Sequence, residues 1–170
     1  ASILDKAKDL RPYLRERGHE TEVNRRISEE TTQIFKDLGF FKLLQPARYG
    51  GYEYGFTGFI DLIAEIGRGC TSTAWGCALG LIHQWLLATL PKQAQDDVWL
   101  ENPQAILCGS YAPATRAVRA DGGYLIKGKW SFASNVDNSQ WALLGVHFPV
   151  TLPSDKPSAG FLLVHRNDWV

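Results

Sequence analysis

His83 is the residue whose type and setting most directly indicate chemistry. It lies in a long apolar stretch, residues 74–90, where an imidazole must find a hydrogen-bond partner or border a cavity. A histidine beside a cavity can act as a general base, because its pKa lies near neutral pH. A core histidine with a satisfied ring is the alternative, which the sequence alone favours. For Trp75 and Trp85 in the same stretch, packing is the simpler interpretation.

A second pattern is the run WSFASN at residues 130–135, where aromatic and small hydroxyl residues alternate. Such alternation is typical of a strand, whose successive side chains point to opposite faces. Trp130, Phe132 and Ser134 would then share one face. A flat heteroaromatic ligand needs an apolar surface and a few placed hydrogen bonds, and this face offers both. A half-buried strand without a ligand is the alternative that the pattern alone favours.

Other catalytic signatures are absent from the sequence. It contains no GxGxxG or GxxxxGK[ST] phosphate loop, no GxSxG elbow and no HExxH motif. Asp137 belongs to a polar stretch that is more simply a turn than a catalytic carboxylate. Three cysteines without zinc-finger spacing predict neither a metal site nor a disulfide framework.

Composition narrows the class of protein. The 170 residues are 45% hydrophobic, and 18 Lys and Arg balance 18 Asp and Glu. A net charge of zero gives no broad attraction to nucleic acid or to an anionic membrane, so we expect neither partner. The first ten residues carry charges where a signal peptide needs an apolar stretch, and residues 74–90 fall short of the roughly 20 residues that span a bilayer. We therefore expect a reducing, cytoplasmic location.

The first hundred residues show helical spacing of apolar side chains. The pattern predicts one helix ending near Gly18 and a second, through Val23 and Ile27, ending near Gly39. The Gly- and aromatic-rich residues 40–56 predict a structured loop. Further helices are expected over residues 57–67, 72–90 and 91–100, with Thr71 or Ser72 capping the longest of them.

From residue 105 onward the pattern changes to short β-rich runs. These are residues 105–112, 114–123, 124–134, 141–148 and 161–169, with a hairpin signal at Asp121-Gly122-Gly123. The sequence therefore predicts an α+β protein, with a helical domain over 1–102 followed by an antiparallel β-domain over 103–170. The last run has no closing element after it, so we expect an N-terminal portion of a longer protein.

Several segments together resemble a known family. They are LLQPARYGGYEYGF, RGCTSTAWGCALGLIHQW, CGSYAPATRAVRADGGYLIKGKWSFAS and NSQWALLGVH. In order and spacing they are similar to the acyl-CoA dehydrogenase superfamily. The STAW helix start with His83 downstream, and the WSFAS run, look most like its flavin-dependent monooxygenases. These are the oxygenase components of two-component aromatic hydroxylases, such as p-hydroxyphenylacetate hydroxylase.

The resemblance implies an architecture larger than this chain. Family members have a helical domain, a central β-domain and a C-terminal four-helix bundle, and the bundle is missing here. They bind the flavin ring between the last two domains. The resemblance also implies a homotetramer, whose cofactor pockets borrow residues from a neighbouring subunit.

The resemblance also assigns roles to individual residues. Ser110, Tyr111, Phe132, Ser134 and Asn135 match cofactor-binding positions, with Ser134 placed to hydrogen-bond flavin N5. His83 matches a helix position that faces the substrate hydroxyl. For substrate binding, Ser110 is a second contact and Trp75 a pocket wall. His83 and Ser134 are thus the expected catalytic residues, and no metal is implied.

The implied reaction is hydroxylation of an aromatic, phenolic substrate by reduced FMN or FAD and O2, through a C4a-hydroperoxyflavin. A separate flavin reductase would supply the reduced flavin. An acyl-CoA dehydrogenase or related flavin oxidase is the alternative, with a carboxylate base outside this chain. A third alternative is a binding or structural module that has lost catalysis.

Overall fold

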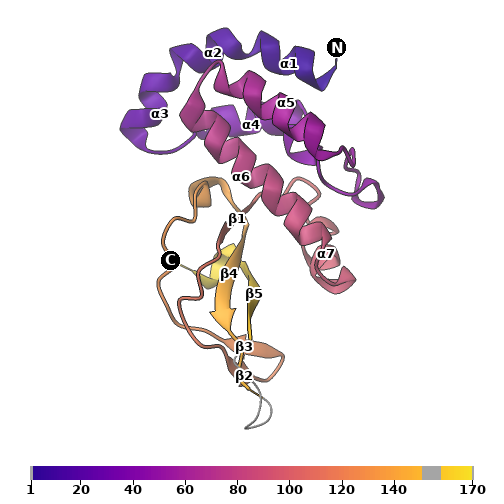
Figure 1. The fold of residues 1–170 in the computed structure, drawn as a ribbon, viewed down its shortest axis with the longest axis vertical. Coiled ribbons are helices and arrows are strands. Elements are labelled where there is room, and N and C mark those ends of the chain that lie inside the picture. Colours follow the sequence, from indigo (N-terminus) through magenta and orange to yellow (C-terminus); the bar gives the residue numbers. More distant parts are fainter. Residues whose placement is uncertain (1, 151–157, 170) are drawn as a thin grey trace.

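The computed structural model describes residues 2–150 and 158–169. Its first part is helical and its second part is built of short strands (Figure 1). The helices are α1 (Ile3–Asp9), α2 (Arg11–Glu16), α3 (Gly18–Asn24), α4 (Glu29–Asp37), α5 (Phe56–Gly67), α6 (Thr71–Ala88) and α7 (Lys92–Trp99). The strands are β1 (Leu107–Ser110), β2 (Val118–Ala120), β3 (Gly123–Leu125), β4 (Trp141–His147) and β5 (Ala159–His165). The α+β class predicted from the sequence is confirmed.

The strands form two small sheets. β2 and β3 make a two-stranded antiparallel hairpin, and Gly122 between them has a φ of 78°. The hairpin predicted at Asp121-Gly122-Gly123 is therefore present. The other sheet has the order β1-β4-β5, with β4 and β5 antiparallel but β1 and β4 parallel. This sheet is mixed, whereas the sequence predicted only antiparallel pairing, because strand direction depends on a long connection that local patterns do not encode.

Three apolar clusters hold these parts together. The first lies among the helices and includes Phe35, Phe40 and Leu62. The second joins α6 and α7 to one face of the mixed sheet through Leu87, Trp99 and other buried side chains. The third covers the opposite face of the sheet. In Figure 1, α6 runs between the other helices and the sheet, so this helix links the two halves of the chain.

The second predicted helix is wrong in part. Val23 is 67% exposed in α3, and Arg25 ends that helix in the left-handed region at a φ of 54°. The next helix, α4, starts only after Ser28, whose side chain caps it by accepting a hydrogen bond from the Thr31 amide. The capping hydrogen bond of Ser28 starts a new helix here, although the apolar spacing continues across this region.

The predicted cap of α6 is also wrong. The helix begins one residue earlier than expected, so Cys70 occupies the N-cap position and no side chain makes a capping hydrogen bond there. Thr71 becomes the first helical residue, and neither it nor Ser72 stands at the N-cap. The predicted extents of α5 and α7 agree with the structure to within one or two residues.

Residues 126–134 do not form the predicted strand. A strand needs a hydrogen-bonded neighbour, and this segment pairs with none among the described residues. Trp130 instead anchors it by donating its indole N–H to the Gly145 carbonyl at 2.8 Å. Phe132 has a φ of 60°, outside the range of a strand. The side chains of Trp130, Phe132 and Ser134 therefore do not share a strand face.

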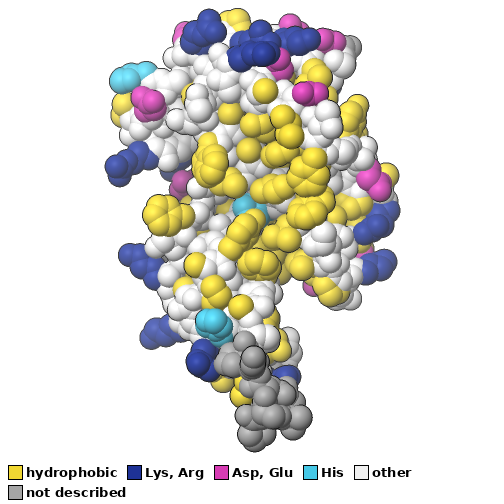
Figure 2. Space-filling model, viewed as in Figure 1, with side chains coloured by type: hydrophobic (Ala, Val, Ile, Leu, Met, Phe, Trp, Pro, Cys, Tyr) yellow, Lys and Arg dark blue, Asp and Glu magenta, His cyan; other side chains and the backbone are white. Residues whose placement is uncertain are grey.

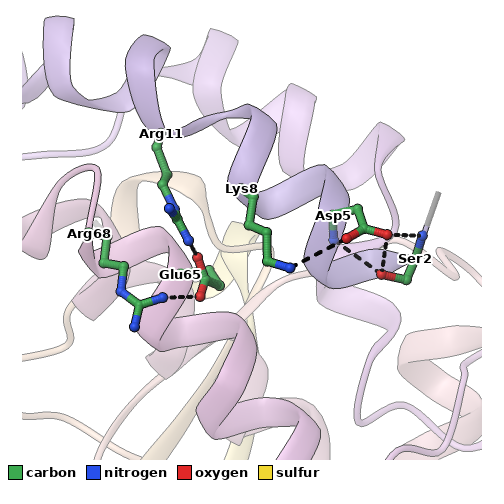
Figure 3. A network of polar contacts seen from close by, with 6 residues as sticks. All are labelled: Ser2, Asp5, Lys8, Arg11, Glu65 and Arg68. Atoms are coloured by element: carbon green, nitrogen blue, oxygen red, sulfur yellow. Dashed lines mark hydrogen bonds and ion pairs between the residues drawn. The ribbon is translucent and has the colours of Figure 1, made fainter.

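An ion-pair network joins α2 to α5 (Figure 3). Glu65 on α5 is buried and forms ion pairs with Arg11 on α2 and with Arg68. At the start of α1, Ser2 and Asp5 form a reciprocal capping box.

No helix within residues 2–150 and 158–169 is long and apolar enough to cross a bilayer.

Candidate functional site

His83 lies on the side of α6 that faces the mixed sheet, with only 1% of its surface exposed. Its Nδ1 forms a hydrogen bond with the Leu79 carbonyl one helical turn earlier. A carbonyl oxygen only accepts, so Nδ1 carries the proton and Nε2 is left as an acceptor. Nε2 is buried and has no hydrogen-bond partner among the described residues. One ring nitrogen is thus hydrogen-bonded and the other is not. His83 is therefore neither a fully hydrogen-bonded core histidine nor a histidine shown to border an open cavity.

Burial also sets the protonation of this histidine. Removal from water lowers the pKa of His83 below its ordinary value, and the hydrogen bond to the Leu79 carbonyl opposes this only in part. The imidazole is therefore neutral at pH 7, with its lone pair on Nε2. A neutral acceptor at this atom is the form that takes a proton from a weak acid.

β1 and the residue that follows it place Gly109 and Tyr111 against His83. A Cβ built on Gly109 would lie 2.4 Å from His83 Nε2, so only glycine leaves room for the imidazole. The ring of Tyr111 lies edge-on to His83, with 5.6 Å between ring centroids. Burial raises the pKa of Tyr111, so its phenol stays protonated at neutral pH. The structure therefore brings His83 and Tyr111 together.

Ser110 lies between these two residues and faces the other way, because side chains alternate along a strand. Its hydroxyl donates a hydrogen bond of 2.7 Å to the Ser131 carbonyl. Ser110 thus binds residues 126–134 to β1 rather than pairing with His83.

A second group of expected site residues gathers around Ser134. The indole Nε1 of Trp75 donates a hydrogen bond to Ser134 Oγ at 3.4 Å, and Trp75 is 63% exposed. The next residue, Asn135, is in the left-handed region at a φ of 68° and accepts a hydrogen bond from Asn138 at 3.0 Å. The amide nitrogen of Asn135 is buried without a partner among the described residues. An unsatisfied donor thus lies beside a hydroxyl and an exposed indole.

Ser134 lines two hollows of the surface. The larger, of about 1250 Å³, lies between one face of the mixed sheet and residues 122–136, and Phe132 and Trp169 also line it. The smaller, of about 630 Å³, is lined by Trp75 and Asn135. Phe132 is 95% exposed, so its ring is free to pack against a ligand or another protein segment.

The residues around Ser134 fit a flavin. Trp75 and Phe132 offer exposed aromatic surface for a flat heteroaromatic ring. The hydroxyl of Ser134 and the unpartnered amide nitrogen of Asn135 offer hydrogen bonds at its heteroatoms. Within the described residues no group of three or more His, Cys, Asp or Glu side chains is arranged to hold a metal ion.

Hydrophobic side chains form a band across one face of the molecule, over the helical part and onto the sheet (Figure 2). The exposed large hydrophobic residues include Tyr52, Tyr54, Phe56, Ile60, Trp75, Trp85, Tyr111 and Phe132. The packing interpretation therefore does not hold for Trp75. Trp85, although 42% exposed, packs edge-to-face on Phe56 with ring centroids 5.3 Å apart.

Gly109, to which the sequence assigns no role, lies against His83 in the structure. A glycine in a predicted strand is a known signal of a close approach by another group. The sequence alone does not show which group approaches, because α6 and β1 meet only in the tertiary structure. The same holds for the contact of Trp75 with Ser134, two residues 59 positions apart.

Comparison with known proteins gives consistent matches. Residues 6–103 match the family described as "Acyl-CoA dehydrogenase, N-terminal domain". The chain is 41% identical over 167 residues to the FADH(2)-dependent resorcinol hydroxylase, oxygenase component, of Rhizobium sp. (strain MTP-10005), a match covering 98% of this chain and 41% of that protein. It is 34% identical to the flavin-dependent monooxygenase, oxygenase subunit HsaA, of Mycobacterium tuberculosis (strain ATCC 25618 / H37Rv), covering 99% of this chain and 42% of that protein.

The solved structure of the HsaA monooxygenase from M. tuberculosis superposes on this chain with a TM-score of 0.90 and 34% identity, covering 98% of this chain and 45% of the other. The chain spans 41% and 42% of the length of the two curated relatives. Since the family match covers more than half of its 170 residues, the chain belongs to the acyl-CoA dehydrogenase family, and within it resembles the oxygenase components of flavin-dependent monooxygenases.

Proposed function

We propose that this chain is part of the oxygenase component of a two-component flavin-dependent monooxygenase that hydroxylates a phenolic substrate. Besides family membership, one structural observation supports this proposal. His83 is held as a neutral imidazole whose unpartnered Nε2 is an acceptor, within a fold shared with proteins named as aromatic hydroxylases. An acceptor of this kind suits a substrate that must give up a hydroxyl proton.

Reduced flavin, when bound, would supply the two electrons that activate O2, and one oxygen atom of O2 would be transferred to the substrate. Trp75, Phe132, Ser134 and Asn135 are the residues of this chain that would hold it. Because Ser134 Oγ accepts the indole N–H of Trp75, its own proton remains to be donated to a ligand atom. Trp75 and Phe132 would exclude water where they pack on the bound ring, which would limit side reactions.

His83 would act on the substrate. Nε2 accepts the proton of the phenol, which makes the phenol oxygen more anionic and the ring more reactive toward an electrophilic oxygen. Proton transfer of this kind typically contributes about 10²–10⁴ in rate. We assign Tyr111 to the wall of the substrate pocket. Ser110 faces away from His83 and is bonded to the Ser131 carbonyl, so we assign it to the flavin side of β1.

The complete protein is proposed to work with a flavin reductase that supplies reduced FMN or FAD. The name of the resorcinol hydroxylase favours FADH2. A cytoplasmic homotetramer is also proposed, since the band of exposed hydrophobic side chains offers surface for association. We propose 1–102 and 103–170 as separate domains, with support from the change from helices to strands between Trp99 and Leu107.

Rapid mixing tests this function. Full-length protein with reduced FMN or FAD is mixed with oxygenated buffer while absorbance is followed in the near ultraviolet and at the bands of oxidised flavin. A transient near-ultraviolet species before oxidised flavin appears, with hydroxylated product from a panel of phenols, is the expected result. Direct reoxidation without the transient, together with tight binding of oxidised FAD, would instead indicate a dehydrogenase or oxidase.

A further inference from the structure

The acceptor atom of His83 is closed off from solvent in this structure. The side chain is 1% exposed, and Nε2 is buried without a hydrogen-bond partner among residues 2–150 and 158–169. A substrate hydroxyl therefore has no open path to the atom that the proposed function requires. Some neighbour of Nε2 must move before His83 contacts a ligand.

Among the described residues, Gly109 and Tyr111 are two that lie beside His83 Nε2. A Cβ at Gly109 of β1 would lie 2.4 Å from Nε2. The same Cβ would lie 3.0 Å from Cε1 of the Tyr111 ring. Both rings thus lie over Gly109, and the tyrosine covers the histidine edge-on at 5.6 Å between centroids.

Of these two residues, Tyr111 is the one whose side chain can move. Gly109 is part of β1, which is paired with β4 in the middle of the sheet. The carbonyl of Tyr111 is packed on Gly145, where a Cβ would come within 2.2 Å of it. The Tyr111 side chain, in contrast, is not enclosed, since this residue is 47% exposed. An edge contact with Phe161, at 5.2 Å between centroids, is its other aromatic contact.

We propose that Tyr111 controls access to His83: its ring covers Nε2 in the closed state, and a phenolic substrate reaches that atom only after the ring turns away. The identity of the substrate rests on the proposed function, whereas the covering of Nε2 does not. Tyr111 then also limits specificity, because a substrate with bulk next to its hydroxyl requires a larger displacement of the ring.

Chemical modification tests the cover without any flavin chemistry. Full-length, flavin-free protein is treated with diethylpyrocarbonate, which acylates accessible neutral imidazole nitrogens, and modification of His83 is followed by peptide mass spectrometry. Open minor states are typically populated at about 0.1–10%, so Tyr111→Ala should speed modification by about tenfold or more. Tyr52→Ala is the matched control, because Tyr52 is also 47% exposed and edge-on to another aromatic ring.

Equal rates of His83 modification in wild type and Tyr111→Ala overturn the proposal, as does rapid modification of His83 in the wild type. Tyr111→Leu, which keeps contact with Phe161 but has no ring, replaces the alanine variant if that variant does not fold. In steady-state assays, Tyr111→Ala should lower KM for bulky phenols more than it changes kcat. If Tyr111→Ala is labelled faster but the full-length protein hydroxylates no phenol, the proposed function is rejected and the covering of His83 by Tyr111 is still supported.

Discussion

The indole nitrogen of Trp75 donates a hydrogen bond to the hydroxyl of Ser134 across 3.4 Å. This contact joins the first half of α6 to the irregular residues 126–134. The oxygen of Ser134 is used as an acceptor, which leaves its proton free for a ligand. Trp75 therefore orients the hydroxyl of Ser134, which lies at the border of two hollows.

Ser134→Ala should raise the fraction of reduced flavin that is oxidised without product formation. Loss of the hydroxyl would remove the hydrogen bond that we propose Ser134 donates to the bound cofactor, so hydrogen peroxide should be released more readily. The measurement is the ratio of hydrogen peroxide to hydroxylated phenol per flavin oxidised. Ser131→Ala is the control, since Ser131 contributes only its backbone carbonyl to the bond from Ser110. An unchanged ratio in Ser134→Ala would remove this residue from the proposed site.

His83→Ala should slow hydroxylation of a phenol by about 10²–10⁴, the usual contribution of a general base. Oxidation of the reduced flavin by O2 should continue, because Nε2 is proposed to act on the substrate. Single-turnover product analysis beside flavin absorbance separates the two. His19→Ala, an exposed histidine on α3, serves as the control. Hydroxylation by His83→Ala at the wild-type rate would exclude His83 as the base.

Stability should fall as the solution is acidified below pH 6.5. The pKa of His83 is lower in the folded chain than its ordinary value of 6.5, so below that pH the unfolded chain binds a proton that the folded chain does not. The contribution of neutral His83 to the free energy of unfolding is therefore complete above pH 6.5. Below pH 6.5 it decreases by at most about 1.4 kcal/mol per pH unit. Urea unfolding of wild type and His83→Gln at pH 7.5 and pH 5.5 measures it. An equal pH dependence in both proteins would contradict this prediction.

Glu65→Ala should destabilise the helical part (Figure 3). Breaking a fully buried ion pair costs about 3–5 kcal/mol, and the partial exposure of Arg11 and Arg68 places the expected loss below that range. Glu30→Ala, which breaks an exposed pair with Arg17, should cost about 0–1 kcal/mol. Denaturant unfolding compares the two. A Glu65→Ala loss no larger than that of Glu30→Ala would show that the buried network does not stabilise the fold.

Local sequence patterns are enough to predict the α+β class, the hairpin at Asp121-Gly122 and most of the helices. These depend on local periodicity and on turn residues whose conformational preferences are intrinsic. The resemblance of whole segments indicated the family. It also selected His83 and Ser134, although periodicity alone gave each a simpler structural interpretation.

The contacts between these residues depend on the packing of elements that are distant in the sequence. Gly109 lies against His83, and Trp75 bonds Ser134, because packing of α6 on the sheet brings together positions far apart in sequence. The irregular backbone at Phe132 arises because no neighbouring strand pairs with this segment in the described part of the chain. Whether an alternating run becomes a strand depends on a hydrogen-bonded partner, and a partner is a property of the fold rather than of the run itself.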